Sequence, residues 1–361
     1  MNAPIDPQGT ALVVGGTGIS GSALTRELVA QGWRTISLSR REVTTQDGIE
    51  SVRADLTDPQ SVQAALAGRS PTHVYFTAWS RMPTEAENIS VNAGMVRNVL
   101  DALGPSGTLE HVALVTGLKH YLGPFEAYGT GSTRDTPFHE DEPRLDAPNF
   151  YYAQEDELWR AADLYDFSWS VHRSHTMIGH AIGNAMNLGQ TLAAQAALSR
   201  AEGTPFIFPG NEVQWNGVTD VTDSGLLARQ MVWAATTPGL PSQAYNTANG
   251  DVFRWRWMWP RIAELLGVEA EGFSERPRPL DEQMVGKTDA WRQLVEREGL
   301  AEPDLSRVAS WWHTDSDLNR PVECFTDMSR SRNAGFTGHA DTLASFAALF
   351  DTLRAERVIP A

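Results

Sequence analysis

The sequence predicts an α/β fold, in which a Rossmann-type, doubly wound parallel sheet is joined to a smaller, mainly helical C-terminal lobe. Three observations lead to this prediction. In the first half of the chain, short β-rich segments alternate with longer helical patterns, which is typical of βαβ units with right-handed crossovers. A glycine-rich turn follows the first β-rich segment. Beyond about residue 177, helical patterns are separated by Gly- and Pro-rich turns.

The individual elements follow in chain order. The β-rich segments are expected at 10–15, 34–39, 73–78 and 111–116. Helical patterns cover 24–31, 62–68 and 92–103, and a further helix begins at "NFYYAQEDELW". In the C-terminal lobe the helical patterns include "NLGQTLAAQAALSRA" and "WRWMWPRIAELLG". Because the strands are expected to be parallel, ligands should collect at their carboxyl ends.

The composition excludes several classes of function. Asp and Glu total 45 against 29 Lys and Arg, a formal net charge of −16 at pH 7, which opposes nonspecific attraction to nucleic acid or anionic lipid. No apolar segment approaches the roughly 18 residues that a membrane span needs, and no secretory signal is visible, so a cytoplasmic protein is expected. The single cysteine, Cys324, excludes an intrachain disulfide, and the histidine spacing predicts no metal site.

The glycine-rich turn has the form of a dinucleotide-binding site. Gly15, Gly18 and Gly21 form G-x-x-G-x-x-G within "VVGGTGISGSALTRELVAQGW", after an apolar β-rich segment and before a helix. Glycines let the turn tighten and let the backbone approach a pyrophosphate, whose charge is held by amides at the helix N-terminus. The alternative is an ordinary strand-to-helix turn.

The residues that end the second strand favour NADPH over NADH. An NAD-binding unit usually carries Asp or Glu about 20 residues after the glycine turn, where the carboxylate accepts hydrogen bonds from ribose hydroxyls. Here "SLSRR" ends in Ser39, Arg40 and Arg41, and guanidinium groups suit a phosphate. Solvated surface arginines are the alternative. Asp55, after the third strand, either faces the adenine or caps the next helix.

The length of 361 residues indicates a core with a dependent second lobe. The Rossmann core, which would bind NADP(H), is predicted to span 1–176 and to be completed by segments around 215–250. The helical, substrate-binding lobe is assigned to 177–214 and 251–361. No long linker or low-complexity segment occurs, so we expect one continuous interface between the two.

The catalytic groups are expected on two separate segments. Short-chain dehydrogenases usually place a tyrosine and a lysine four residues apart on one helix, but here Glu155 stands four residues after Tyr151. The chain holds only two lysines, Lys119 and Lys287. Lys119 lies just past the predicted strand 111–116, at the edge where open α/β sheets bind ligands. Lys119 and Tyr151 are therefore the catalytic candidates, with a solvated lysine and a packing aromatic as the alternatives.

These residues lie in blocks that resemble the progesterone 5β-reductase and iridoid synthase family, an atypical group of extended short-chain dehydrogenases. The matching blocks are "GGTGISG", "SRR", "TGLKHYLGPFEAYG", "EDEPRLDAPNFYYAQED", "WSVHR", "MNLG", "PFIFPG", "ANGDVFRW" and "ECFTDMSRSRNAGF", and they run nearly from end to end of the chain. Two departures concern the cofactor loop and the pocket wall. The family's "VHRP" reads "VHRSH" here, and "TWA" is replaced by "TAWSR".

The resemblance implies an NADPH-dependent reductase of the carbon–carbon double bond of enones and enals. Tyr151 would donate a hydrogen bond to the carbonyl oxygen, and Lys119 would supply positive charge and hold the nicotinamide ribose. The pocket for a small hydrophobic substrate would be lined by Trp79, Tyr121, Phe125 and Tyr152. The expected cofactor-binding residues are Gly15, Thr17, Gly18, Ile19, Gly21, Ser39, Arg40, Arg41, Asp55, Leu56, Thr77, Thr116, Lys119, Tyr151, His175 and Thr176.

Other activities stay open on the same fold. Reduction of the carbonyl group itself differs only in which carbon receives the hydride, and a non-catalytic NADPH-binding protein is a further alternative. Sugar-nucleotide dehydratases and epimerases normally keep the Tyr-x-x-x-Lys pair, so its absence argues against them. The aromatic residues of the C-terminal lobe suggest a hydrophobic pocket for terpenoid-sized, steroid-like or small cyclic enones. The sequence leaves the oligomeric state open, a homodimer included.

Overall fold

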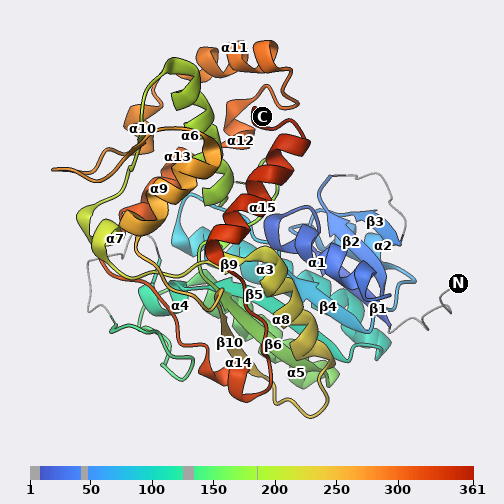
Figure 1. Cartoon of the computed structure of the whole chain (residues 1–361). Coiled ribbons are helices and arrows are strands. Elements are labelled where there is room, and N and C mark those ends of the chain that lie inside the picture. Colours follow the sequence, from blue (N-terminus) through green and yellow to red (C-terminus); the bar gives the residue numbers. More distant parts are fainter. Residues whose placement is uncertain (1–8, 42–47, 125–133, 185) are drawn as a thin grey trace, which may run out of the picture.

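A seven-stranded sheet forms the centre of the computed structural model, which describes residues 9–41, 48–124, 134–184 and 186–361. The strand order is β10-β6-β5-β4-β1-β2-β3, and every neighbouring pair is parallel (Figure 1). The strands are β1 (Thr10–Val14), β2 (Arg34–Ser39), β3 (Ile49–Arg53), β4 (His73–Phe76), β5 (His111–Gly117), β6 (Ser168–Ser174) and β10 (Gln243–Thr247). The chain order reverses between β1 and β4, and in open sheets a ligand crevice forms outside the carboxyl ends at such a reversal.

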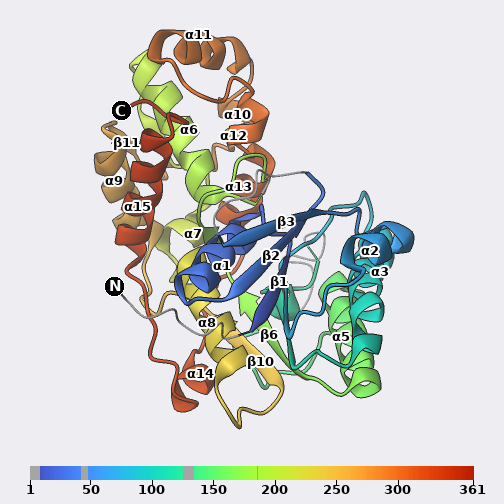
Figure 2. The ribbon, with the colours of Figure 1, turned by 90° about the vertical axis from the view of Figure 1, so that its right-hand side faces the viewer.

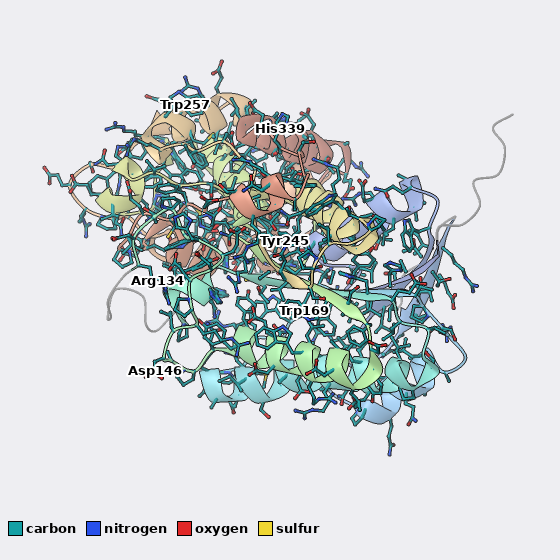
Figure 3. The ribbon with its side chains drawn as sticks, turned by 90° about the horizontal axis from the view of Figure 1, so that it is seen from below. Arg134, Asp146, Trp169, Tyr245, Trp257 and His339 are labelled. Atoms are coloured by element: carbon teal, nitrogen blue, oxygen red, sulfur yellow. The ribbon has the colours of Figure 1, made fainter. Side chains whose placement is uncertain are left out.

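Helices cover both faces of the sheet, so the central strands β4 and β5 are buried along nearly their whole length. On one face pack α2 (Pro59–Leu66), α3 (Glu85–Leu103) and α5 (Phe150–Tyr165). On the other face lie α1 (Ile19–Ala30) and α8 (Ser224–Thr236) (Figure 2). Figure 3 shows the layer of α3 and α5 below the sheet, and Trp169 of β6 packs on this face of the sheet.

Two helix starts are explained by local capping. Helix α3 begins seven residues before the predicted 92–103 segment, because Thr84 and Glu87 form a reciprocal capping box ahead of it. Helix α5 begins after Asn149, whose side chain accepts a hydrogen bond from the Tyr151 amide. The first turn of α5 is therefore fixed by a side chain at its N-terminus.

The C-terminal lobe is mainly helical and has a core of its own. Its helices are α6 (Leu188–Glu202), α7 (Glu212–Asn216), α9 (Trp255–Leu266), α10 (Leu280–Gln283), α11 (Thr288–Glu298), α12 (Leu305–Val308), α13 (Trp311–Leu318) and α15 (Thr342–Ala355). Trp255, Trp259 and Trp291 are buried in this core. These tryptophans therefore pack the lobe itself.

The remaining elements are short. Two-stranded sheets join β7 (Met177–Ile178) to β9 (Thr222–Asp223), and β8 (Phe206–Ile207) to β11 (Ala270–Glu271). Helix α4 (Lys119–Leu122) follows β5, a 3-10 turn occupies Gly104–Ser106, and α14 (Ser329–Asn333) contacts β10. Within the described ranges, no helix has both the length and the apolar character that crossing a membrane requires.

Candidate active site

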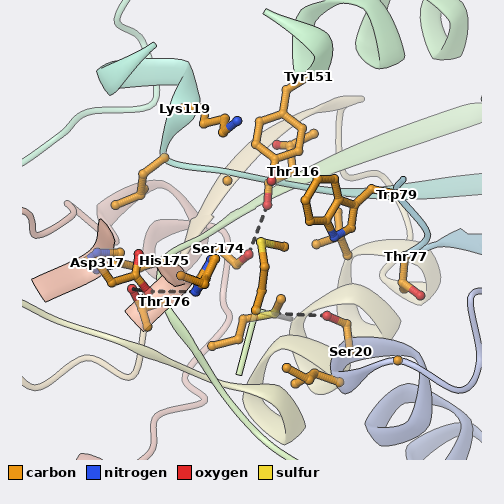
Figure 4. A pocket seen from close by; sticks show the side chains of 18 of the residues that line it. Ser20, Thr77, Trp79, Thr116, Lys119, Tyr151, Ser174, His175, Thr176 and Asp317 are labelled. Carbon is orange, nitrogen blue, oxygen red and sulfur yellow. Dashed lines mark hydrogen bonds and ion pairs between the residues drawn. The ribbon is translucent and has the colours of Figure 1, made fainter. Parts of the chain in front are cut away.

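Two adjoining cavities run along the carboxyl ends of the strands. The arginine cavity holds Arg40 and Arg41, which follow β2. The tyrosine cavity holds Lys119 and Tyr151 (Figure 4). Both cavities are lined by Gly18, Thr77, Ala78, Trp79 and Asn184, so one elongated ligand can extend from one into the other.

The predicted cofactor residues gather at these two cavities, with one exception. The arginine cavity is lined by Gly15, Thr17, Gly18, Ser39, Arg40, Arg41, Asp55, Leu56 and Thr77. The tyrosine cavity is lined by Gly18, Ile19, Thr77, Thr116, Lys119, Tyr151, His175 and Thr176. Gly21 lines neither cavity. A Cβ atom there would lie 2.1 Å from the Gly15 carbonyl oxygen, so this glycine lets α1 pack against the turn.

The turn itself brings backbone groups close to the cavities. Gly15 has a φ of +89°, and a Cβ atom on it would lie 3.0 Å from the Ala78 amide nitrogen. Helix α1 starts after Gly18, which offers no side-chain cap. Because the first amides of a helix have no partner within the helix, the start of α1 is suited to bind an anion.

The arginine cavity combines two cations with one carboxylate. Arg40 and Arg41 are exposed, and the Ser39 hydroxyl donates to the Arg41 carbonyl oxygen at 2.6 Å. Asp55 accepts hydrogen bonds from the Thr57 hydroxyl and amide, which hold the pKa of Asp55 below its usual range. Of the two roles considered for Asp55, helix capping is excluded, because the cap of α2 is Asp58.

Lys119 and Tyr151 reach the tyrosine cavity from different elements (Figure 4). Lys119 is the first residue of α4, and Tyr151 lies in the first turn of α5. The Tyr151 hydroxyl lies against Gly117, where a Cβ atom would be only 3.3 Å from it. The Lys119 side chain is buried, and its Nζ lies 4.8 Å from the centroid of the Phe150 ring. The structure thus brings the two candidates to one cavity.

Two hydroxyl groups in this cavity are suited to donate hydrogen bonds to a ligand. Burial raises the pKa of Tyr151, and the Glu85 carboxylate adds to this effect, so the phenol is protonated at neutral pH. Thr116 Oγ1 is buried and has no hydrogen-bond partner among the described residues. Since buried hydroxyls normally have one, Thr116 is a second group that a ligand would satisfy.

A buried polar cluster forms another wall of the tyrosine cavity. His175 Nδ1 lies 2.6 Å from Asp220 Oδ1, and His175 Nε2 faces Arg320 Nη1 within hydrogen-bond distance. Arg320 also donates to Thr176 and Asp317. Burial lowers the pKa of His175, and the Arg320 charge lowers it further. The imidazole is therefore neutral, with its proton on Nδ1 and with Nε2 accepting from the guanidinium.

Among the wall residues that the sequence analysis missed are several polar and charged ones. Asn184 lines both cavities, while His313, Asp317 and Arg320 line the tyrosine cavity. No local motif marks them; the departure "VHRSH", which puts His175 in the wall, was the nearest signal. Besides Met177 and Met186, the helical lobe thus contributes polar and charged side chains to this cavity, where aromatic residues had been expected.

Tyr121 and Tyr152 line neither cavity, which corrects their expected place in the substrate pocket. The Tyr121 hydroxyl donates to Asn246 Oδ1 at 2.7 Å, and its ring stacks on Phe138. The Tyr152 hydroxyl donates to the His120 carbonyl oxygen at 2.8 Å. Both side chains are used for packing beside the site.

The other two predicted pocket residues differ from these. Trp79 lines both cavities, and its ring stacks on the Phe150 ring with 5.8 Å between the ring centroids. Phe125 lies outside the described residues. In the described part of the chain, no three His, Cys, Asp or Glu side chains are grouped as metal ligands would be.

Comparison with known proteins identifies the family. The model of the PRISE-like Rossmann-fold domain matches residues 43–360. An (S)-8-oxocitronellyl enol synthase of Camptotheca acuminata is 37% identical over 99% of this chain and 95% of its own length. The chain belongs to the PRISE family. A 3-oxo-Delta(4,5)-steroid 5-beta-reductase of Arabidopsis thaliana is 36% identical to this PRISE protein, over 98% of the chain and 94% of its own. The family resemblance inferred from the motif blocks is confirmed.

Solved structures support the fold of the PRISE chain. RMD from Pseudomonas aeruginosa, complexed with NADPH, matches with a TM-score of 0.67 at 16% identity, over 96% of this chain and 99% of its own. The UDP-glucose 4-epimerase of Thermus thermophilus, complexed with NAD, matches with a TM-score of 0.66 at 17% identity, over 96% and 99%. The predicted Rossmann-type parallel sheet is confirmed.

Proposed function

We propose that this protein is an NADPH-dependent reductase of the carbon–carbon double bond of α,β-unsaturated carbonyl compounds. The observation that carries the proposal is the meeting of Tyr151 and Lys119 in one cavity, although they come from separate elements. Glu155, at the position of the lysine in a Tyr-x-x-x-Lys pair, is buried, pairs with Arg144 at 2.9 Å and lines neither cavity. Relatives named as an enol synthase and a steroid 5-beta-reductase support the same reading.

The two cavities fit NADPH. At Gly15 and at Gly21, an added Cβ atom would lie too close to neighbouring backbone atoms, so both positions require glycine. A turn built from such glycines lets the backbone approach a pyrophosphate closely. Arg40 and Arg41 would hold the 2′-phosphate, for which guanidinium groups are suited. Thr116 and Lys119 would lie at the nicotinamide end. When bound, NADPH supplies the hydride that reduces the β-carbon of the substrate.

The residues of the tyrosine cavity would stabilise the charge that develops on the substrate. Reduction at the β-carbon moves negative charge onto the carbonyl oxygen, and a catalyst must bind that oxygen more strongly as the charge grows. The Tyr151 hydroxyl, held protonated by burial, donates a hydrogen bond to it. The Lys119 ammonium adds positive charge from the adjoining wall. The α-carbon takes its proton from solvent.

The first experiment follows NADPH oxidation with 2-cyclohexen-1-one, progesterone and cyclohexanone in parallel, with NADH as the control cofactor, and identifies the products by mass spectrometry. A saturated ketone formed from an enone, with NADPH favoured, is the expected result. An allylic alcohol, or turnover of cyclohexanone alone, would instead show a carbonyl reductase. NADPH binding without oxidation of any of the three would show a non-catalytic binding protein.

Replacing Arg40 or Arg41 with alanine is expected to weaken NADPH binding and leave NADH binding unchanged. A hydrogen bond to a charged group contributes about 1.5–3 kcal/mol, which corresponds to roughly a 10- to 150-fold increase in Kd. Fluorescence titration measures the Kd of each variant for NADPH and for NADH. The control is Arg34→Ala, because Arg34 is exposed at the opposite end of the same strand. Equal losses for NADPH and NADH would contradict a phosphate-binding role.

We also infer a cytoplasmic location. Cys324 is a buried free thiol, which suits a compartment where thiols are kept reduced. Fractionation of cells that produce the protein measures this directly, and recovery in the membrane pellet would contradict it. A homodimer stays a prediction.

A further inference from the structure

We propose that Asn149 is the positioning residue that sets Lys119 and Tyr151 relative to each other, an inference that rests on the function proposed above. The Asn149 side chain bonds to the backbone of both residues. Its Oδ1 accepts from the Tyr151 amide at 3.0 Å, and its Nδ2 donates to the Lys119 carbonyl oxygen at 2.8 Å. Asn149 is only 3% exposed. One buried amide therefore bridges the two catalytic segments.

Such a bridge is needed because the two candidates do not share a helix. In a Tyr-x-x-x-Lys pair, one helical turn fixes the separation of the side chains. Here Lys119 and Asn149 are 30 residues apart in the chain. Lys119 opens α4, which has 4 residues, and a single helical turn is not stable by itself. The position of Lys119 must therefore be set by contacts from outside α4.

The start of α5 supplies these contacts. The Asn149 amide bonds to the carbonyl of the first residue of α4, Lys119. The Tyr152 hydroxyl donates to the carbonyl of the second, His120, at 2.8 Å. On the other side, Asn149 is the N-cap of α5 and thereby fixes the turn that carries Tyr151. Without the Asn149 side chain, the segments that carry the lysine and the tyrosine could therefore move independently of each other.

The hydrogen bond from residue 149 to the Lys119 carbonyl oxygen needs a side-chain amide, whereas the capping bond from the Tyr151 amide does not. Asn, Asp and Ser all accept a hydrogen bond from a helix amide and are all good N-caps. The bond to the Lys119 carbonyl requires a donor, which a carboxylate lacks, and the serine hydroxyl is too short to make both contacts. Asn149→Ser and Asn149→Asp therefore keep the cap and remove the bridge, while Asn149→Ala removes both.

The kinetic test compares these variants of the full-length enzyme. We expect Asn149→Ser and Asn149→Asp to lower kcat on 2-cyclohexen-1-one by up to about 100-fold, the effect of a small misplacement of reacting groups, with a nearly parental Tm. Agreement between them excludes a charge effect. Asn149→Ala is expected to lose both kcat and Tm. The matched control is Asn249→Ser, because Asn249 is equally buried, accepts from the Asp223 amide and donates to Thr342, yet lines neither cavity.

A second readout does not depend on turnover. Because the chain has only two lysines, nitrogen-15-labelled lysine gives two backbone amide signals in NMR, which Lys287→Arg assigns. The Lys119 signal is expected to shift in the Asn149→Ser and Asn149→Asp variants and to stay in place in Asn249→Ser. An unmoved Lys119 signal, or a parental kcat in both capped variants, would overturn the proposal. If the parent reduces no enone, the proposed function fails, while the amide signals still show whether Asn149 holds Lys119.

Discussion

Replacing Tyr151 with phenylalanine is expected to lower kcat on an enone by about 100- to 1000-fold, the loss that follows removal of one oxyanion donor in other enzymes. The ring stays in the cavity and only the hydroxyl is lost. This hydroxyl is protonated because burial raises the pKa of Tyr151, so it donates as charge reaches the carbonyl oxygen. Since the bond strengthens mainly in the transition state, KM for the enone should change little. Steady-state NADPH oxidation measures both constants.

The control for this change is Tyr165→Phe. Tyr165 is the last residue of the same helix, and its hydroxyl faces Asp101 at the surface, far along α5 from the tyrosine cavity. Its kcat should equal that of the parent. A parental kcat in the Tyr151→Phe variant as well would remove Tyr151 from the mechanism and leave Thr116 as the hydroxyl to test next.

Much of the fold could be predicted because its signals are local. The strand β1, the glycine turn and the start of α1 form one continuous pattern within about twenty residues of sequence, and β1 itself, covered on both faces, is almost wholly apolar. The start of α3 was placed late, since its first turn is polar and its capping box, Thr84 and Glu87, was not used. Boundaries of this kind depend on side-chain hydrogen bonds that an apolar pattern does not show.

In the candidate site, too, the residues that stand in local motifs could be predicted, and those brought together by tertiary packing could not. Lys119 and Tyr151 stand in local motifs: Lys119 is two residues beyond the end of β5, and Tyr151 is two residues beyond the cap of α5. Asp317 and Arg320 come from the helical lobe and Asp220 from the segment around 215–250, and they meet beside His175 at the end of β6, a contact that no short pattern encodes. Their meeting follows from tertiary packing, which the sequence alone did not reveal.

Tyr121 and Tyr152 were predicted to line the pocket because they are close in sequence to Lys119 and Tyr151, but closeness in sequence did not place them there. Tyr152 is next to Tyr151, but consecutive residues of a helix point in different directions and do not face each other. Its hydroxyl therefore reaches His120, while Tyr151 faces the cavity. The same holds for Tyr121, two residues after Lys119 in α4, whose ring turns to Phe138.

Replacing Lys119 with methionine is expected to lower kcat by at least about 100-fold, because the charge that faces the developing oxyanion is lost. Methionine has a similar length and is apolar, so it suits a site where the lysine is buried beside the Phe150 ring. If the ammonium also holds the nicotinamide ribose, KM for NADPH rises in this variant and stays parental in Tyr151→Phe. Steady-state kinetics with NADPH varied separate the two.

The other lysine of the chain provides the matched control. Lys287 pairs with Glu202 at 2.7 Å and lines neither cavity, so Lys287→Met should keep the parental kcat. Parental kcat and KM in Lys119→Met would show that this cation has no part in the reaction.

The double variant Lys119→Met with Tyr151→Phe tests whether the two residues act as one unit. The effects of residues that act together on kcat are not additive in free energy, so the kcat of the double variant should be little lower than that of the slower single variant. If the two residues acted independently, their fold-losses in kcat would multiply.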